Sequence, residues 1–313
     1  MAFTWTYDAP AGVYKSHAMS RKLYEKALEN TKFMSFIRPV DGFGRKKGET
    51  ITLTRLGTIA EPTSATLMEN TRIPEDTIAL STVAITVSEY GRAVPFNSLA
   101  EDLSEFDIEN PIQNRLTEQK TLVLDTAAAA AFKTAKICYI PTGLAAGTWD
   151  TDGTASTAAT ANWNVFHVEE IVDYLYDTLL APPWVDEDYM AIVRTLGLRG
   201  IKRDTAWEQW KIYTTPEAKA SGEVGRLERL RFVQTNHNNA LGKVGTASVL
   251  GEGVVFGRDA VAMAEVLTPE LRAAIPADFG RSKSVAWYGI LAFGIIWDTA
   301  NAGEARIVRV TSS

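Results

Sequence analysis

A long helical signal between about residues 108 and 136 constrains the fold of this chain more than any other feature. Pro111 in the first turn, with Asp107 and Glu109 beside it, is typical of a helix N-terminus. Five consecutive alanines, 127–131, favour helix and let another element approach closely. At 1.5 Å per residue the helix is roughly 37 Å long. One apolar stripe is predicted to face a core, formed by Ile112, Leu116, Val123, Ala127 and Ala130.

The composition is that of a folded protein, with 46% hydrophobic and 22% charged residues among 313. A net charge of −6 argues against a dedicated nucleic-acid binder. A single cysteine, Cys138, excludes an intrachain disulfide and fits a reducing compartment. The longest apolar run, Ile290–Trp297, is too short to cross a bilayer, so we expect no membrane association.

Charge is distributed unevenly along the chain. Residues 1–47 contain nine Lys or Arg against four Asp or Glu, whereas residues 61–118 contain eleven Asp or Glu against three Lys or Arg. One explanation is that the basic segment and the acidic segment each form a separate surface exposed to solvent. The alternative hypothesis is that a basic arm and an acidic excursion meet on neighbouring copies of the chain.

Two alternating segments, Thr50–Leu56 and Thr82–Ser88, predict strands that flank about 25 mostly polar residues. So long a loop is unusual inside a compact domain. The pattern therefore predicts a projecting hairpin that binds another subunit. Residues 1–46 before it predict an arm, with a helix that starts at Ser16 or Ser20 and runs to about Asn30.

The remaining chain predicts a surface excursion followed by an α/β lobe. Residues 143–164 are small and polar, and Asn164 is placed to cap a helix from Val165 to about Leu180. Over about 185–285, predicted strands (189–194, 230–235, 253–257) alternate with predicted helices (196–210, 258–266). The last apolar runs, 286–297 and 305–310, predict antiparallel strands that return to the long helix.

Residue patterns for catalysis or metal binding are weak. His17, His167 and His237 lack metal-ligand spacing; the composition around His237 predicts a surface histidine, with the same expectation for His167. Cys138 is predicted to be a small core residue.

The carboxylates Asp186–Asp188 need a convergent partner before they can act as acids, bases or metal ligands. We expect no catalytic residue, cofactor or metal, and so no enzyme. An enzyme with an acidic site near Asp186–Asp188 is the alternative from another functional class.

The order of these features resembles the major capsid (coat) proteins of tailed phages with the Hong Kong 97-type fold. The residues that carry the resemblance are Gly48–Thr54 (GETITLT), Val87–Val94 (VSEYGRAV), Ser221–Thr235 (SGEVGRLERLRFVQT), Gly257–Ala260 (GRDA) and Trp287–Trp297. The third is similar to the coat subgroup with a Gly-Glu-Val/Ile-Gly element. The resemblance implies an α+β fold. Its expected parts are an N-terminal arm (1–46), an extended hairpin or E-loop (47–92), a P-domain with a spine helix (93–184 and 286–313, with the excursion at 143–164) and an A-domain (185–285).

That resemblance implies a structural protein that assembles into hexamers and pentamers of an icosahedral shell. The shell would enclose double-stranded DNA without sequence-specific binding, in a virion assembled in the host bacterial cytoplasm. A scaffolding protein, a portal and decoration proteins are further partners that it implies, and an encapsulin-like compartment shares the fold. The residues expected to make assembly contacts are Glu61, Glu69, Arg72, Glu75 and Asp76 on the hairpin, with Arg45, Lys46 and Lys47 before it.

Overall fold

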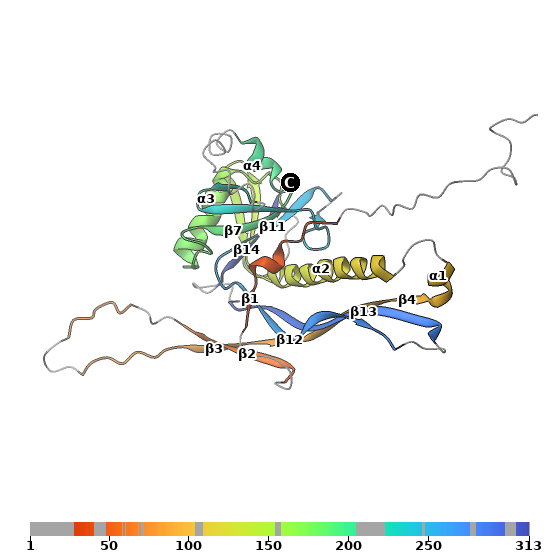
Figure 1. Cartoon of the computed structure of the whole chain (residues 1–313). Coiled ribbons are helices and arrows are strands. Elements are labelled where there is room, and N and C mark those ends of the chain that lie inside the picture. The colour runs from red at the N-terminus through yellow and green to blue at the C-terminus, as the bar shows by residue number, and fades with distance from the viewer. Residues whose placement is uncertain are drawn as a thin grey trace, which may run out of the picture.

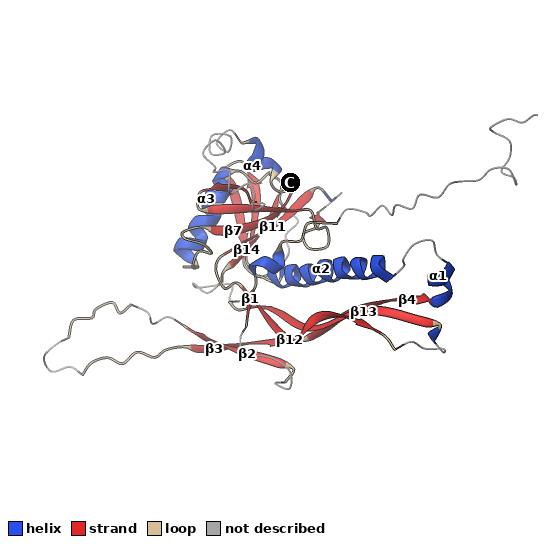
Figure 2. Ribbon diagram, in the orientation of Figure 1, coloured by secondary structure: helices blue, strands red, loops and turns tan. Residues whose placement is uncertain are grey.

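A computed structural model describes residues 28–40, 48–57, 59, 61–67, 69, 72–103, 109–153, 158–204, 223–245, 248–275, 280–297 and 305–312. Figure 1 shows a lobe above one end of a long helix, α2, which lies along a narrow second sheet. A two-stranded hairpin leaves this sheet and extends away from both. The predicted α+β class is therefore confirmed, with strands in all three parts (Figure 2).

The helical elements are short except for α2. They are a 3-10 turn η1 (Phe33–Phe36), α1 (Ser98–Leu103), α2 (Glu109–Lys133), α3 (Val165–Asp173), a π turn η2 (Tyr174–Thr178) and α4 (Arg199–Arg203). Asn164 caps α3 as predicted, because its side chain accepts a hydrogen bond from the His167 backbone N–H at 3.3 Å. No helix in the described ranges is both long and apolar enough to cross a membrane.

The strands form three sheets. The four-stranded sheet has the order β1 (Arg38–Pro39), β12 (Val261–Ala273), β13 (Ser282–Ile295), β4 (Ser88–Asn97). The lobe sheet has the order β6 (Ala146–Asp150), β5 (Cys138–Gly143), β14 (Ile307–Ser312), β11 (Leu250–Phe256), β7 (Tyr189–Arg194), β9 (Leu230–Thr235), β8 (Glu223–Leu227), with β10 (Lys243–Val244) paired to β11. The hairpin pairs β2 (Thr50–Leu56) with β3 (Leu80–Thr86).

Helix α2 has the predicted extent within a few residues, but the predicted stripe is only partly right. Leu116 is buried with Val285 and Trp287 of β13, as expected for a face that packs on the sheet. Toward its C-terminus the helix instead buries Ala128, Ala129 and Phe132 against η1 and the lobe. Because α2 is covered on different faces along its length, no single stripe describes it. Ala130, which the stripe includes, is exposed and Ala127 is half-buried.

The segment 258–266 was predicted as helix and is instead the start of strand β12. β12 pairs antiparallel with β13 from Val261↔Ile295 to Ala273↔Val285. The Ala, Met and Glu side chains of this segment suit a helix locally, but pairing with a long partner strand overrides weak local propensity. β12 therefore belongs to the sheet beneath α2, although its residues fall within the segment 185–285 that was predicted to form the lobe.

The last two strands do not pair with each other, so that prediction is wrong. β13 joins β12 and β4 beneath α2, whereas β14 lies in the lobe between β5 and β11. β14 runs parallel to β5 and antiparallel to β11, with Gly251↔Ser312 and Phe256↔Ile307 at the ends of the second pairing. Each of the two strands therefore pairs with two other strands, in two separate sheets.

The segment 143–164 is more ordered in the lobe than its composition indicates. Its first part forms β6, which pairs with β5 from Cys138↔Asp150 to Gly143↔Ala146. Trp149 stacks on Tyr174 with ring centroids 4.0 Å apart, and Trp163 is fully buried against Phe232. The two tryptophans therefore anchor small and polar sequence to the lobe. Of the helix predicted at 196–210, the described part contains α4, and residues 205–210 lie outside the described ranges.

Candidate assembly surface

The base of the projecting hairpin is anchored to the body by one face. The alternation predicted for β2 and β3 is confirmed by their register, from Thr50↔Thr86 to Leu56↔Leu80. Ile51 and Leu53 point to the same side as buried Ile85 and pack against Ala262 and Ala292 of the four-stranded sheet. Arg55 strengthens this anchor by donating to the Ile296 carbonyl at 3.5 Å.

Beyond this base, the described residues of the hairpin belong to no hydrophobic core of the chain. The Gly57 N–H donates to the Ala79 carbonyl at 2.8 Å, and no regular strand is described between Leu56 and Leu80. Six large aliphatic side chains here are between 51% and 69% exposed: Leu56, Ile59, Leu67, Ile73, Ile78 and Leu80. Exposed apolar side chains that recur along one projection are typical of a surface that another chain covers.

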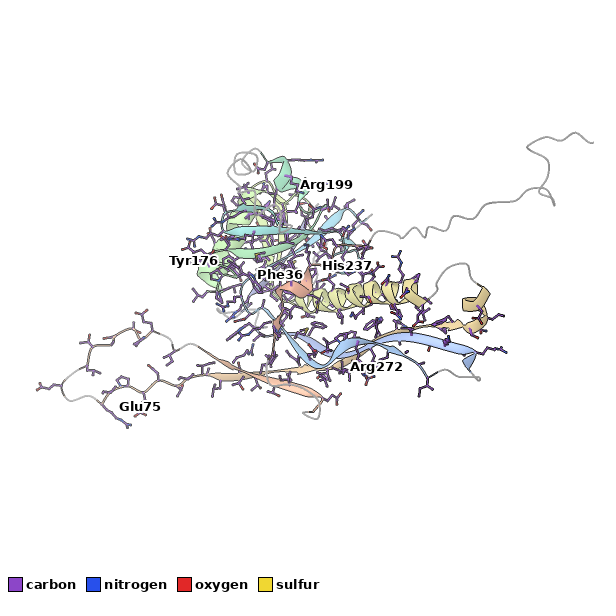
Figure 3. The ribbon with its side chains drawn as sticks, in the orientation of Figure 1. Phe36, Glu75, Tyr176, Arg199, His237 and Arg272 are labelled. Atoms are coloured by element: carbon purple, nitrogen blue, oxygen red, sulfur yellow. The ribbon has the colours of Figure 1, made fainter. Side chains whose placement is uncertain are left out.

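The five hairpin residues predicted to make assembly contacts all lie on this projection. Glu61, Glu69, Arg72, Glu75 and Asp76 are exposed, and Arg72 donates to Glu75. Figure 3 shows Glu75 on the part of the loop far from the lobe. One arginine cannot balance four carboxylates, so the loop keeps an acidic surface. The basic residues expected to complement it, Arg45, Lys46 and Lys47, lie outside the described residues.

A groove runs between α2 and the sheet beneath it. It has a volume of about 260 Å³, and one wall is formed by small side chains, Ala127, Ala130 and Ala131 of α2 with Thr134 just after it. The other wall comes from Tyr90 and Phe293 with their neighbours. The exposed Ala130 of the alanine run thus faces an open groove rather than a core. That these alanines permit the close approach of another element stays a prediction.

A buried polar cluster joins the arm, α2 and the lobe, and the sequence reading missed it. Asp125 of α2 is 0% exposed and His237, which follows β9, is 1% exposed. The His237 Nδ1 lies 2.9 Å from Asp125 Oδ2, and Asp125 Oδ1 accepts from the backbone N–H of Phe33 at 2.8 Å. Figure 3 shows His237 beside Phe36 at the junction of the lobe and α2. The predicted surface position for His237 is therefore wrong.

The arm segment before η1 is held by the same junction. The Asn30 N–H donates to Asn236 Oδ1 at 2.6 Å, and the Thr235 hydroxyl donates to the Asn30 carbonyl at 2.7 Å. Phe33 then packs on Phe132 with ring centroids 5.4 Å apart. The arm therefore leaves the body from a fixed point. The sequence signal for this junction is Asp125, which stands in the mainly apolar stretch 122–131, because a charged side chain that is buried there needs a polar partner.

The carboxylates at 186–188 form a structural cluster rather than an open site. Asp188 is 1% exposed and accepts from Arg226 Nε at 3.0 Å and from Arg231 Nε at 2.7 Å. Glu187 lies 3.4 Å from Arg229. These pairs hold the 185–188 turn against β8 and β9 and occupy the Asp188 carboxylate, whereas the side chains of Asp186 and Glu187 remain exposed. Within the described ranges, no group of three or more His, Cys, Asp or Glu side chains is placed to hold a metal ion.

Two further predictions concern residues inside the lobe. Cys138 is buried as predicted. His167 is also buried, contrary to the surface prediction, with Nδ1 2.8 Å from the hydroxyl of Tyr139. That hydroxyl donates to Glu170. Burial lowers the pKa of His167, partly opposed by the Gly143 carbonyl and Glu170, and burial with the Glu170 hydrogen bond raises the pKa of Tyr139. Because these three side chains pair with one another inside the lobe, we interpret the cluster as structural.

Comparison with known proteins finds relatives by structure only. No protein-family model matches the sequence, and no curated protein matches it. Among solved structures, the chain is similar to the Cyanophage Pam1 capsid asymmetric unit (TM-score 0.70, 12% identity, 97% of this chain and 98% of that chain covered). It is also similar to the acidic stable capsid structure of Helicobacter pylori bacteriophage KHP30 (0.72, 12%, 95% and 95%) and the capsid of Ralstonia phage GP4 (0.68, 14%, 99% and 98%).

These similarities cover nearly the whole of both chains, so they concern the complete architecture and not one shared motif. The chain has the Hong Kong 97-type fold of tailed-phage capsid proteins. The Gly-Glu-Val/Ile-Gly subgroup remains a prediction, because the similarities do not test that element.

Proposed function

We propose that this chain is the major capsid protein of a tailed double-stranded DNA phage, and that it assembles into hexamers and pentamers of an icosahedral shell. The fold supports the proposal, and the observation that carries it is the projecting hairpin. Four mostly exposed aliphatic side chains lie on the loop, Ile59, Leu67, Ile73 and Ile78, and Leu56 and Leu80 add two more at the ends of its strands. Such a surface requires a covering partner. A second copy of the chain is the partner that this function supplies.

The parts of the molecule suit distinct roles in a shell. In the proposed arrangement, lobes meet at the capsomer axes and each hairpin lies over the α2 helix of the next copy. The groove beside Ala127 and Ala130 is a suitable seat for aliphatic side chains of that hairpin. Contacts of this heterologous kind close into rings when the rotation between copies allows it. The arm, which leaves from the Asp125–His237 junction, would reach an adjacent copy.

Charge supports the same contact between copies. The proposed partners of Glu61, Glu69, Glu75 and Asp76 are Arg45, Lys46 and Lys47 of a neighbouring chain. Such pairs at an interface rim steer association and fix register more than they raise affinity. We further propose the division into arm (1–46), extended hairpin (47–92), spine-helix domain (93–184 and 286–313) and lobe domain (185–285), with the sheet pairing adding β12 to the spine side and β14 to the lobe side.

The proposed location is the virion capsid, after assembly in the host cytoplasm. An acidic chain suits a shell that encloses its genome without many phosphate contacts, because each such contact would resist DNA release. A scaffolding protein, a portal and decoration proteins are the other proposed partners. We propose no catalytic role, since the strongest acidic candidate, Asp188, is occupied by two arginines.

Size-exclusion chromatography with light scattering, followed by negative-stain electron microscopy, tests this proposal. We expect shells, or rings of five or six copies, at high protein concentration or after addition of a crowding agent. A chain that remains monomeric under every such condition, and also when a scaffolding protein is co-expressed, would contradict it. Shells that take up an enzyme rather than DNA in the native host would indicate an encapsulin-like compartment instead.

A further inference from the structure

A basic cavity opens on the lobe, away from the hairpin and from the groove beside α2. It has a volume of about 510 Å³ and lies where β7 and β9 end, beside α4 and β10. Its cationic side chains are Arg194, Arg199 and Lys243. Figure 3 shows Arg199 on the lobe, far from Glu75 on the hairpin. The other described lining residues are Thr195, Leu196, Asn236, Ser248 and Val249, so no carboxylate is among the described residues of the lining.

The positive charge of this cavity is not neutralised within the described part of the chain. Arg199 and Lys243 are exposed, and neither forms an ion pair with a described carboxylate. Arg194 is held in place by one nitrogen, Nη1, which donates to the Leu241 carbonyl at 2.6 Å. This differs from the other arginine-rich place in the lobe, where Arg226 and Arg231 both bind Asp188. Three cations around one cavity without a counter-charge favour an anion.

In two of the neutral polar side chains of the cavity, the oxygen atom already accepts a hydrogen bond, so the groups that remain for a ligand are mainly donors. The Thr195 hydroxyl oxygen accepts from Gln234 Nε2 at 2.5 Å, which leaves its O–H to donate elsewhere. Gln234 is in turn oriented by Lys202, whose Nζ donates to Gln234 Oε1 at 3.0 Å. Asn236 Oδ1 accepts from the Asn30 N–H, so the free group of that side chain is its NH2. A cavity whose unused groups are N–H and O–H donors fits an oxyanion.

We propose that this cavity binds a phosphate-type oxyanion, with Arg199 and Lys243 as its principal ligands and Arg194, Thr195 and Asn236 as supporting donors. Guanidinium donors in a fixed fork match the oxygens of phosphate. The concave shape favours a small polyphosphate over the rod of a DNA duplex. This inference goes beyond the proposed function, because it concerns a site within one chain and does not require assembly.

Isothermal titration calorimetry with sodium tripolyphosphate on the full chain, at low ionic strength, tests the proposal. We expect saturable binding at one site per chain. Replacing both principal ligands (Arg199→Gln with Lys243→Gln) should weaken it by on the order of a hundredfold, since each lost charged hydrogen bond costs one or more factors of ten. The matched control is Arg92→Gln with Lys136→Gln, which removes the same charge from exposed positions outside the cavity. It should bind as the parent chain does.

The outcomes separate the site from general attraction to a polyanion. An absence of tripolyphosphate binding, or equal weakening by both double variants, would overturn the proposal. Inorganic phosphate and a short DNA duplex serve as further ligands that distinguish a free oxyanion from nucleic-acid phosphates as the source. Tighter binding of a peptide with the sequence 61–78 than of tripolyphosphate would also overturn it, in favour of a carboxylate partner. Failure of the chain to form shells would bear on the proposed function and leave this result unchanged.

Discussion

Strand β7 in the lobe and strand β2 in the hairpin are similar in length but differ in what surrounds them. β7 has β11 on one side and β9 on the other, and five of its six residues are buried. β2 has only β3, and its residues alternate between exposed and half-buried. The lobe satisfies its strands within one chain. The hairpin carries apolar side chains that its own chain leaves uncovered, so its composition is explained by a partner and not by folding.

The two regions should therefore respond differently to mutation. A side chain of the body contributes to the free energy of unfolding of a single chain. A side chain of the outer hairpin should, under the proposed function, contribute to association between chains and little to folding. Each of the following predictions compares these two effects, beginning with the largest.

Phe132→Ala should lower the free energy of unfolding by about 3–5 kcal/mol, because it leaves a cavity where α2 meets η1 and β11. The Phe132 ring is fully buried, with centroids 5.4 Å from Phe33 and 4.9 Å from Phe256. Urea denaturation followed by circular dichroism measures the change. Leu67→Ala on the hairpin is the comparison variant and should stay within about 0.5 kcal/mol of the parent chain. Equal losses for both variants would remove the distinction between the regions.

Asp125→Ala should destabilise the chain by about 3 kcal/mol, because it leaves buried His237 and the Phe33 N–H without their hydrogen-bond acceptor. Glu118→Ala on the same helix removes a partly exposed ion pair with Arg115 and should cost under about 1 kcal/mol. The same denaturation experiment compares them. Limited proteolysis should also cut the arm of Asp125→Ala faster than that of Glu118→Ala. A loss no greater than that of the control would show that the junction does not hold the arm.

Acid should weaken the lobe through His167. Because burial places the folded pKa of His167 below its unfolded value, the unfolded chain binds the proton more readily. The stabilisation is therefore complete above about pH 6.5 and decreases as the pH falls below that value. His167→Gln should lose less stability than the parent chain as the pH falls from about 7 to about 5, measured by urea denaturation at each pH. Parallel pH profiles for the two proteins would contradict this role of His167.

Neutralising the hairpin with Glu75→Gln and Asp76→Asn should leave stability within about 0.5 kcal/mol and slow assembly at low salt. The matched control, Glu169→Gln with Asp173→Asn, makes the same charge change at exposed positions of α3. Time-resolved light scattering compares the two double variants at several salt concentrations. Equal assembly rates for both would argue against an electrostatic role of the hairpin.

Features that depend on neighbours in sequence were predicted well. The extent of α2, the alternation of β2 and β3, the cap at Asn164 and the burial of Cys138 follow from local patterns. The projecting loop that carries Glu61, Glu69, Arg72, Glu75 and Asp76 was also expected, because a long polar stretch between two strands has no core to enter. That these residues contact another chain stays a prediction.

Features that depend on distant residues were not predictable in this way. Asp125 and His237 are 112 residues apart, and only the fold shows that each buries the other. β12 reads locally as a helix and becomes a strand because β13 is available to pair with it. The basic cavity combines Arg194 at the end of β7 with Lys243 of β10, two positions that no spacing rule links. Tertiary contacts thus decided both the core polar cluster and the candidate oxyanion site.

The most direct measurement compares the intact chain with a variant that lacks residues 61–78. This deletion leaves β2 and β3 intact and leaves five residues, 57–60 and 79, to connect them, a length that closes an ordinary hairpin. We expect urea denaturation to give the same free energy of unfolding within about 0.5 kcal/mol, while sedimentation and electron microscopy show small species in place of shells. Normal shells formed by the deleted chain would refute a role of the hairpin in assembly, and a deleted chain that no longer folds would refute its independence from folding.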